Sequence, residues 1–219
     1  MKKRVIKVIG DSLSAGAGSS LSRETDEIIF EEGGRTYYKL DAPNGWSSLL
    51  ENYLNEKYGD YKVTNKGCCG AATYQIDMFL DELVSEEDEI VIVLMGANDR
   101  KRIHGLEELK VNCTNVIDRL LKKGKQVVIL TPTPSTYVNE HRADRLHRTE
   151  QIVEIIREKT VREDVLFIDN YKYILDYLKE NQLKIDDIMS GEGCVSDGLH
   201  PPDFVQKLIC ENVIRNMGL

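Results

Sequence analysis

One run of six apolar residues constrains the fold of this chain more than any other segment. Residues 90–95 read Ile-Val-Ile-Val-Leu-Met without a polar interruption. A strand with one solvated face alternates apolar and polar residues, whereas a strand covered on both faces is apolar throughout. We therefore expect residues 89–95 to form a central strand of a parallel sheet with helices on both sides.

Four further segments with strand character alternate with helical ones along the chain. The other predicted strands are residues 5–9, 61–64, 126–130 and 165–168. Apolar residues at helical spacing predict helices over 46–58, 73–84, 106–123, 143–159, 171–181 and 203–216. This alternation predicts an α/β fold with three layers, α/β/α, around a five-stranded parallel sheet. At 219 residues the chain fits a single domain, 1–219.

A long polar connection, residues 17–44, separates the first strand from the first helix. It greatly exceeds the usual length of about 2–6 residues for such loops. Within it, residues 28–30 and 36–38 flank Gly33 and Gly34, a pattern that predicts a β-hairpin. The insertion is a candidate lid over a site, and an ordinary surface hairpin is the alternative.

Charge and hydropathy exclude several classes of partner. The net charge is −8, which argues against nucleic acid or an anionic membrane surface. No segment approaches the roughly 18 uninterrupted apolar residues of a membrane span. The basic start, residues 1–4, is followed by only five residues of strand character before Gly10, too few for a signal peptide. We expect a cytoplasmic protein. Its five cysteines, without any CxxC pair, are expected to be reduced thiols.

Two segments at opposite ends of the chain carry groups suited to nucleophilic catalysis. Ser12 follows Gly10 and Asp11 at the end of the first strand, and ligands of α/β sheets bind at such strand ends. Asp197 and His200 lie in the loop before the last helix. A carboxylate that orients an imidazole can activate a serine hydroxyl. Taken alone, the Asp-x-x-His spacing is also compatible with a surface carboxylate and a histidine at a helix entry.

Ester hydrolysis also needs hydrogen-bond donors for a developing oxyanion. Gly70 follows the second predicted strand, and Asn98 follows the central one. A glycine allows substrate to approach the backbone, and an asparagine amide is a donor. Each residue by itself is equally typical of an ordinary turn.

Together these segments resemble the SGNH (GDSL) hydrolases. Gly10-Asp11-Ser12-Leu13 is similar to the GDSL block of that family, and Asn65-x-x-x-x-Gly70 to its second block. The remaining matches are Gly96-x-Asn98-Asp99 with the GxND block and Asp197-x-x-His200-Pro201 with the DxxHP block. All four occur in the family's order between residues 5 and 201. Cys68 and Cys69 depart from the small or aliphatic residues of the second block.

The resemblance implies a flavodoxin-like SGNH hydrolase fold and a serine esterase without cofactor or metal, acting on a small-molecule ester. Ser12 would be the nucleophile, His200 the general base and then acid, and Asp197 the group that orients His200. The oxyanion hole would comprise the backbone N–H groups of Ser12 and Gly70 and the side chain of Asn98. Gly67 lies in the same block, and the spacing from Asn65 favours Gly70.

The motifs leave the substrate open. Tyrosines and charges in the 17–44 insertion favour short acyl groups on polar substrates, carbohydrates and hence acetylesterase activity among them. A lysophospholipase, an acyl thioesterase and an acyltransferase would use the same site. A non-catalytic binding module is the alternative from a different class, although every catalytic position is filled.

Other motifs favour other chemistries only weakly. Gly16-Ala17-Gly18 resembles a dinucleotide fingerprint that lacks its third glycine, and His141 and His147 are six residues apart without metal-ligand spacing. Cys68, Cys69 and Cys194 are either buried inert thiols or pocket-lining ones. The basic loop Arg100, Lys101, Arg102 and His104 is either solvated or placed to meet an anionic substrate.

Overall fold

The computed structural model describes residues 4–189 and 197–219 of the chain. Its main sheet contains five parallel strands in the order β4-β1-β5-β6-β7. Their bounds are β1 (Arg4–Gly10), β4 (Tyr61–Gly67), β5 (Ile90–Leu94), β6 (Gln126–Leu130) and β7 (Val165–Ile168). The predicted α/β fold is confirmed, and the strand order is that of flavodoxin-like sheets, with the order reversing between β1 and β5.

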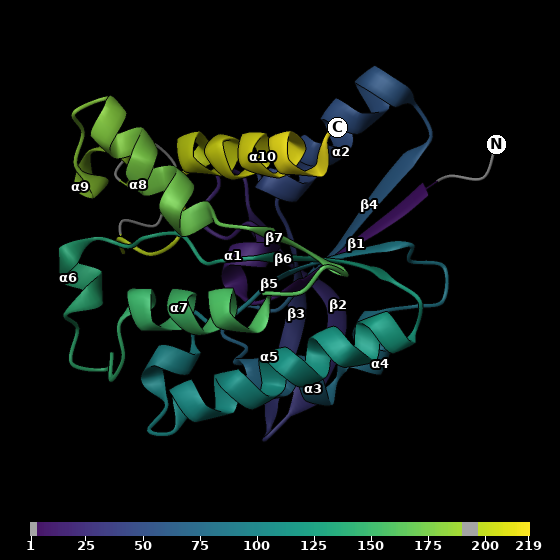
Figure 1. Ribbon diagram of the computed structural model, residues 1–219, viewed down its shortest axis with the longest axis horizontal. Coiled ribbons are helices and arrows are strands. Elements are labelled where there is room, and N and C mark those ends of the chain that lie inside the picture. The colour runs from purple at the N-terminus through teal and green to yellow at the C-terminus, as the bar shows by residue number, and fades with distance from the viewer. Residues whose placement is uncertain (1–3, 190–196) are drawn as a thin grey trace.

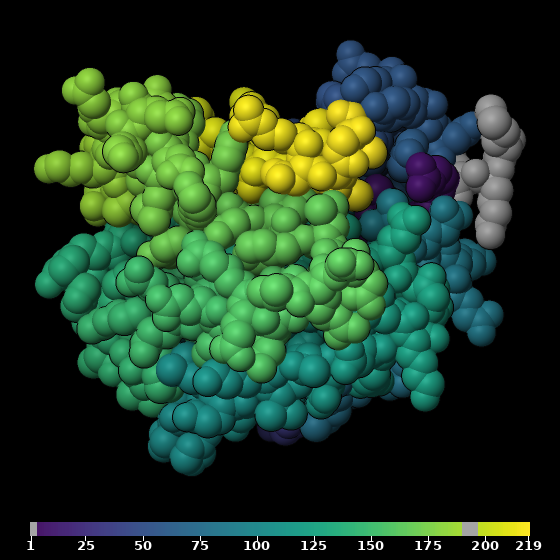
Figure 2. Space-filling view, in the orientation of Figure 1, coloured from purple at the N-terminus to yellow at the C-terminus, as the bar shows by residue number. Residues whose placement is uncertain are grey.

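Helices cover both faces of the sheet and create two apolar cores. One face packs against α2 (Trp46–Tyr58), α8 (Asn170–Glu180) and α10 (Asp203–Met217). The other packs against α3 (Thr73–Met78), α4 (Leu80–Leu83), α5 (Gly105–Lys122) and α7 (Thr149–Lys159) (Figure 1). In the space-filling view α10, in yellow, lies between the segments that form α8 and α2 (Figure 2). All five residues of β5 are buried, as expected for a central strand.

Shorter helical elements connect these layers. They are α1 (Ser12–Ala15), the 3-10 helix η1 (Asp99–Lys101), α6 (Tyr137–Glu140) and α9 (Ile185–Ile188). Both α1 and η1 directly follow the carboxyl ends of sheet strands, β1 and β5, where the strand order reverses. α1 and η1 therefore lie where a ligand site is expected.

Two predicted helices differ from the structure. The segment 73–84 is not one helix, because it breaks at Phe79 between α3 and α4. The helix predicted over 143–159 begins only at Thr149. The backbone N–H groups of Leu146 and His147 instead donate to the carbonyl of Arg100, at 2.8 and 3.1 Å. These tertiary bonds hold residues 143–148 outside the helix, and the Leu146 side chain is exposed.

The predicted hairpin is present as β2 (Arg23–Glu32) and β3 (Arg35–Asp41), paired antiparallel around Gly33 and Gly34. Two of its aromatic side chains, Phe30 and Tyr37, are buried in one core. The Phe30 ring stacks on Phe79 with centroids 4.3 Å apart. The hairpin thus packs against the core of the domain through these aromatic side chains. Its role as a lid stays a prediction.

No helix in the described stretches, 4–189 and 197–219, is long and apolar enough to cross a bilayer. Residues 190–196, among them Cys194, lie outside the described residues.

Candidate active site

Local backbone geometry places Ser12 at the point where strand order reverses. Gly10 ends β1 with φ +135°, and a Cβ there would lie 1.8 Å from the carbonyl oxygen of Leu94 in β5. The Asp11 carboxylate then accepts hydrogen bonds from the N–H groups of Leu13 (2.9 Å) and Ala97 (3.0 Å). Asp11 thereby caps α1 and ties it to the loop after β5. Burial raises the pKa of Asp11 to about 6, so its charge depends on these donors.

Ser12, His200 and Asp197 form one hydrogen-bonded chain. His200 Nε2 lies 2.9 Å from Ser12 Oγ, and His200 Nδ1 lies 2.6 Å from Asp197 Oδ2. An ionised carboxylate only accepts hydrogen bonds, so Nδ1 carries the hydrogen and Nε2 accepts from the serine hydroxyl. The structure therefore joins groups 188 residues apart in the sequence, in the arrangement required to activate a serine.

The Asp197 carboxylate stays ionised although it is half-buried. Loss of solvent by itself would raise its pKa, but the bonds from the His200 ring and from the backbone N–H groups of His200 and Leu199 outweigh that effect. The pKa of Asp197 consequently lies well below its ordinary value. A permanent negative charge thus faces the imidazole and stabilises its protonated form.

Gly70 and Asn98 line the same cavity, of about 480 Å³. Gly70 has φ +86° in the turn after β4. One N–H of the Asn98 amide donates to the carbonyl of Ala71 at 3.0 Å, which fixes the amide and leaves its second N–H for another acceptor. As the first residue of α1, Ser12 has an N–H without an acceptor inside that helix.

The structure also separates the two glycines of the second block. A Cβ on Gly67 would lie 2.3 Å from the backbone nitrogen of Ala15, so Gly67 permits close packing of α1 on β4. Asn65 stabilises this contact, because its amide donates to the carbonyl of Ser14 at 2.7 Å and its oxygen accepts from Gly67 N–H at 2.8 Å. Gly70, unlike Gly67, is a wall residue of the cavity.

Asp99 holds the turns of Gly70 and Asn98 together. It accepts hydrogen bonds from both the backbone N–H (3.1 Å) and the hydroxyl of Thr73, which begins α3. Burial raises the pKa of Asp99 to about 7 against these hydrogen bonds. The distance between Gly70 and Asn98 therefore depends on the buried Asp99 carboxylate. Its position in the GxND block did not indicate that Thr73 is its partner.

Two residues that support His200 were missed in the sequence. Gly18 has φ +93°, and a Cβ there would lie 2.7 Å from the backbone carbonyl of His200. This contact, rather than dinucleotide binding, accounts for the glycine. The buried Gln206 donates to the carbonyl of Pro201 at 3.0 Å and accepts from the N–H of Trp46 at 3.0 Å. Gly18 stood only in a weak dinucleotide-like motif and Gln206 in none, so only the packing reveals their contacts with the segment of His200 and Pro201.

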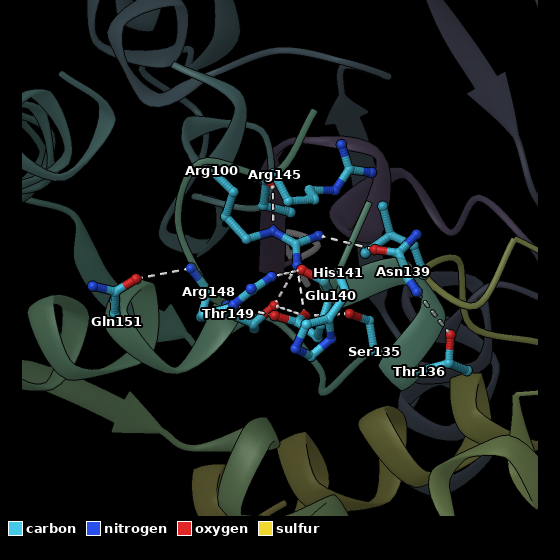
Figure 3. Close-up of polar contacts among 12 residues, drawn as sticks. Arg100, Ser135, Thr136, Asn139, Glu140, His141, Arg145, Arg148, Thr149 and Gln151 are labelled. Carbon is cyan, nitrogen blue, oxygen red and sulfur yellow. Dashed lines mark hydrogen bonds and ion pairs between the residues drawn. The ribbon is translucent and has the colours of Figure 1, made fainter. Parts of the chain in front are cut away.

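A buried polar network connects Arg100 of η1 to Asn139 and Glu140 of α6 (Figure 3). Arg100, with no exposed surface, forms an ion pair with Glu140 at 2.6 Å and donates to Asn139 at 3.4 Å. Asn139 in turn donates to the backbone carbonyl of Asp197 at 2.9 Å. Arg100 is therefore a structural residue, and both interpretations of it, as a solvated cation and as a contact for an anionic substrate, are wrong.

Further hydrogen bonds of this network involve Glu140 and the backbone of the loop that carries Asp197. Glu140 also accepts hydrogen bonds from the hydroxyls of Ser135 and Thr149. Burial works to raise the pKa of Glu140, but these bonds and the Arg100 charge lower it, so the carboxylate is ionised. The N–H of Thr136 donates to the carbonyl of Gly198 at 2.9 Å. The loop that carries Asp197 is consequently held at two backbone points, the carbonyls of Asp197 and Gly198.

The cysteines near the second block are poorly suited to thiol chemistry. Burial raises the pKa of Cys68 to about 12 and that of Cys69 to about 11. Thiols rather than thiolates predominate at neutral pH, and thiols are weak nucleophiles. Within residues 4–189 and 197–219, no cluster of His, Cys, Asp or Glu has an arrangement that would hold a metal ion.

Comparison with known proteins gives a consistent set of relatives. The model of the GDSL-like lipase/acylhydrolase family matches residues 8–206. Esterase TesA of Pseudomonas aeruginosa is 26% identical over 128 residues, which cover 58% of this chain and 53% of that protein. The matched region thus spans about half the length of this curated relative.

Solved structures share the fold over nearly the whole chain. A catalytic mutant of Axe2, an acetylxylan esterase from Geobacillus stearothermophilus, superposes with a TM-score of 0.72 at 18% identity, covering 100% of this chain and 96% of that one. The lipase/acylhydrolase from Enterococcus faecalis gives a TM-score of 0.72 at 20% identity, covering 98% and 95%. At these identities the likeness concerns the fold.

Proposed function

The chain belongs to the GDSL-like lipase/acylhydrolase family, and we propose that it is a serine esterase that cleaves carboxylic esters through an acyl-enzyme on Ser12. The observation that carries this proposal is the continuous chain of hydrogen bonds from Ser12 through His200 to Asp197. A non-catalytic binding module would have no need for all three groups in this arrangement.

In the first half-reaction, Ser12 Oγ forms a bond to the acyl carbon while its proton passes to His200 Nε2. The carbonyl π electrons move to the oxygen, which becomes an oxyanion. Collapse of this intermediate breaks the bond to the leaving alkoxide, and the alkoxide takes the proton from His200 Nε2. The products of this half-reaction are an alcohol and the acylated Ser12.

In the second half-reaction, water attacks the acyl carbon and gives a proton to His200 Nε2. Collapse of the second intermediate releases the carboxylic acid and returns that proton to Ser12 Oγ. Asp197 keeps the ring in the productive tautomer and stabilises the imidazolium in both steps. No step requires a cofactor.

We assign the oxyanion hole to the N–H groups of Ser12 and Gly70 and the Asn98 amide. Support comes from the shared cavity of Gly70 and Asn98 and from the amide of Asn98, which one bond to Ala71 already orients. Donors fixed before the reaction need no reorganisation when charge develops on the substrate oxygen.

The proposed substrates carry short acyl groups on polar, carbohydrate-like alcohols. The walls of the cavity beside Gly70 and Asn98 are rich in polar and charged side chains, among them Glu32, Gln75 and Arg102. Such walls disfavour a long alkyl chain, which gains free energy only against apolar surface. Acetylxylan esterases are among the proteins that share this fold.

Two measurements test this function. Ser12→Ala should reduce hydrolysis of 4-nitrophenyl acetate to the uncatalysed background while the circular dichroism spectrum and melting temperature stay close to wild type, because the change removes only the hydroxyl. Rates on 4-nitrophenyl esters from acetyl to palmitoyl should fall with chain length. Wild-type activity in the alanine variant would refute the nucleophile, and a rate maximum at eight carbons or more would refute the substrate class.

A further inference from the structure

The cavity beside Gly70 and Asn98 is bordered by cations from two separate elements. Arg35 comes from β3 of the hairpin, and Lys101 and Arg102 come from η1 and the residue that follows it. The chain as a whole has a net charge of −8. A local excess of positive charge in an acidic protein, next to the proposed oxyanion hole, favours negatively charged ligands in this cavity.

Arg35 is held in position against Gly70. Its Nη2 donates to the carbonyl of Cys69 at 2.7 Å, and its guanidinium lies over the Tyr37 ring, 4.6 Å from the centroid. A Cβ added to Gly70 would lie 2.5 Å from the same Nη2. The guanidinium therefore adjoins the backbone of a proposed oxyanion donor, and its stacking on a buried tyrosine limits its movement.

Arg35 also retains unused binding capacity. In the described part of the chain no carboxylate lies within ion-pair distance of it, whereas Arg102 is paired with Glu108 at 2.6 Å. Glu32, the carboxylate of the cavity wall, accepts instead from Gln75 (2.9 Å) and Tyr74 (3.2 Å). A guanidinium has five N–H donors in a planar fork, and the backbone bond to Cys69 uses one of them.

We propose that this cavity binds an anionic substituent of the ester, a carboxylate or a phosphate, and that Arg35 is its main contact, with Lys101 of η1 adding positive charge. The planar fork matches the paired oxygens of both groups. This inference rests on the proposed esterase function and narrows its substrates to esters that carry a negative charge near the scissile bond.

Three pairs of esters distinguish where the charge lies and which group carries it. 4-Nitrophenyl hydrogen adipate and 4-nitrophenyl hexanoate place the difference in the acyl group. In the second pair, 4-acetoxybenzoate carries a carboxylate on the leaving alcohol and its methyl ester does not. In the third pair, 4-acetoxyphenyl phosphate carries a phosphate on the leaving alcohol, and 4-methoxyphenyl acetate is its neutral counterpart. Wild-type enzyme should prefer the anionic member of at least one pair.

Arg35→Gln tests the contact, Arg35→Lys keeps the charge without the fork, and Arg23→Gln is the matched control. Arg23 lies on the same hairpin and pairs with Asp41 at the surface. For the preferred anionic ester, Arg35→Gln should lower kcat/KM about tenfold, chiefly through KM, with partial recovery in Arg35→Lys. The neutral ester, and both esters with Arg23→Gln, should change less than about twofold.

Equal effects of Arg35→Gln on charged and neutral esters, or no effect on either, would overturn this inference. Wild-type turnover of neutral esters without preference for any anionic partner would overturn it as well, while the esterase function would stand. If wild type and Ser12→Ala are equally inactive on every ester, the proposed function itself fails and takes this inference with it.

Discussion

At the scale of single residues, His200 owes its orientation to groups that contact it from two directions. Asp197 binds its Nδ1 and its backbone N–H, and Gly18 lies against its backbone carbonyl. The imidazole is thus fixed before substrate arrives. A displacement of about 1 Å at a reacting group can cost about a hundredfold in rate, so such contacts have consequences for kcat.

Asp197→Asn should lower kcat for 4-nitrophenyl acetate by about a thousandfold or more, because an amide can stabilise the wrong imidazole tautomer and has no charge to offset the imidazolium. Asp176→Asn, at an exposed carboxylate of α8, is the control. Rates within about tenfold of wild type would contradict the assigned role of Asp197.

The same carboxylate makes stability depend on pH. The pKa of Asp197 is lower in the folded protein than in the unfolded chain. The ionised Asp197 therefore contributes fully to the free energy of unfolding above pH 3.8, its ordinary pKa, and this contribution is lost as the pH falls from 3.8 towards the folded pKa. The free energy of unfolding of wild type should exceed that of Asp197→Asn by about 2 kcal/mol at pH 7. This difference, measured by urea titration, should shrink between pH 4 and pH 3. A constant difference over this range would contradict the shift.

Gly18→Ala should lower kcat about tenfold or more, since the new methyl group cannot fit beside His200. Gly33→Ala is a matched control, because Gly33 also has positive φ but no atom within 4 Å of the added Cβ. Both variants share the backbone strain of a positive φ, so only contact with His200 separates them. Equal kinetics in the two variants would argue against a positioning role for Gly18.

At the scale of elements, η1 and α6 together support the loop that carries Asp197. Arg100 follows Asn98 and reaches Asn139 and Glu140 of α6, and Asn139 holds the carbonyl of Asp197. The proposed oxyanion donor and the proposed acid–base pair are therefore connected through a buried ion pair. Removal of one partner from such a pair leaves an uncompensated charge, which is strongly destabilising.

Asn139→Ala should lower kcat about tenfold with a nearly unchanged KM, because the substrate contacts remain while the Asp197 loop loses one anchor. The pH–rate profile should also shift, which a purely structural change would not cause. Asn115→Ala, at an exposed amide of α5 that binds Asp77, is the control. An unchanged pH profile together with wild-type kcat would remove Asn139 from the positioning network.

At the scale of the whole molecule, the sheet separates two cores that both depend on its central strand. Side chains of β5 enter the two cores alternately, with Val91 and Val93 in one and Ile90, Ile92 and Leu94 in the other. The loop after β5, which carries Asn98, starts from the carboxyl end of this strand, so its position depends on how β5 is packed. Stability and site geometry are consequently coupled through it.

Ile92→Ala should lower the free energy of unfolding by about 2–5 kcal/mol, because it removes a fully buried side chain and leaves a cavity. Leu166→Ala on the edge strand β7, where the side chain is 37% exposed, should cost distinctly less. Chemical denaturation of both variants measures the difference. Equal losses would contradict a central role for β5.

Much of this architecture can be predicted from the sequence, because strand and helix periodicity and the four motif segments are local properties. The apolar run of β5, the hairpin around Gly33 and the placement of Ser12 at a strand end all follow from neighbouring residues. The helix expected over 143–159 was wrong because its first residues bond to Arg100, and such a contact between distant segments leaves no periodic pattern.

Tertiary structure decided which of the candidate residues meet. Ser12 and His200 are 188 residues apart, and only the folding of the whole chain brings Ser12 Oγ and His200 Nε2 to 2.9 Å. The same folding buried Arg100, which looked like a solvent-facing cation, and set Arg35 of a distant hairpin against Gly70. Local sequence determines what each segment is, whereas the topology determines which side chains share a site, since contacts between distant segments depend on the packing of the whole chain.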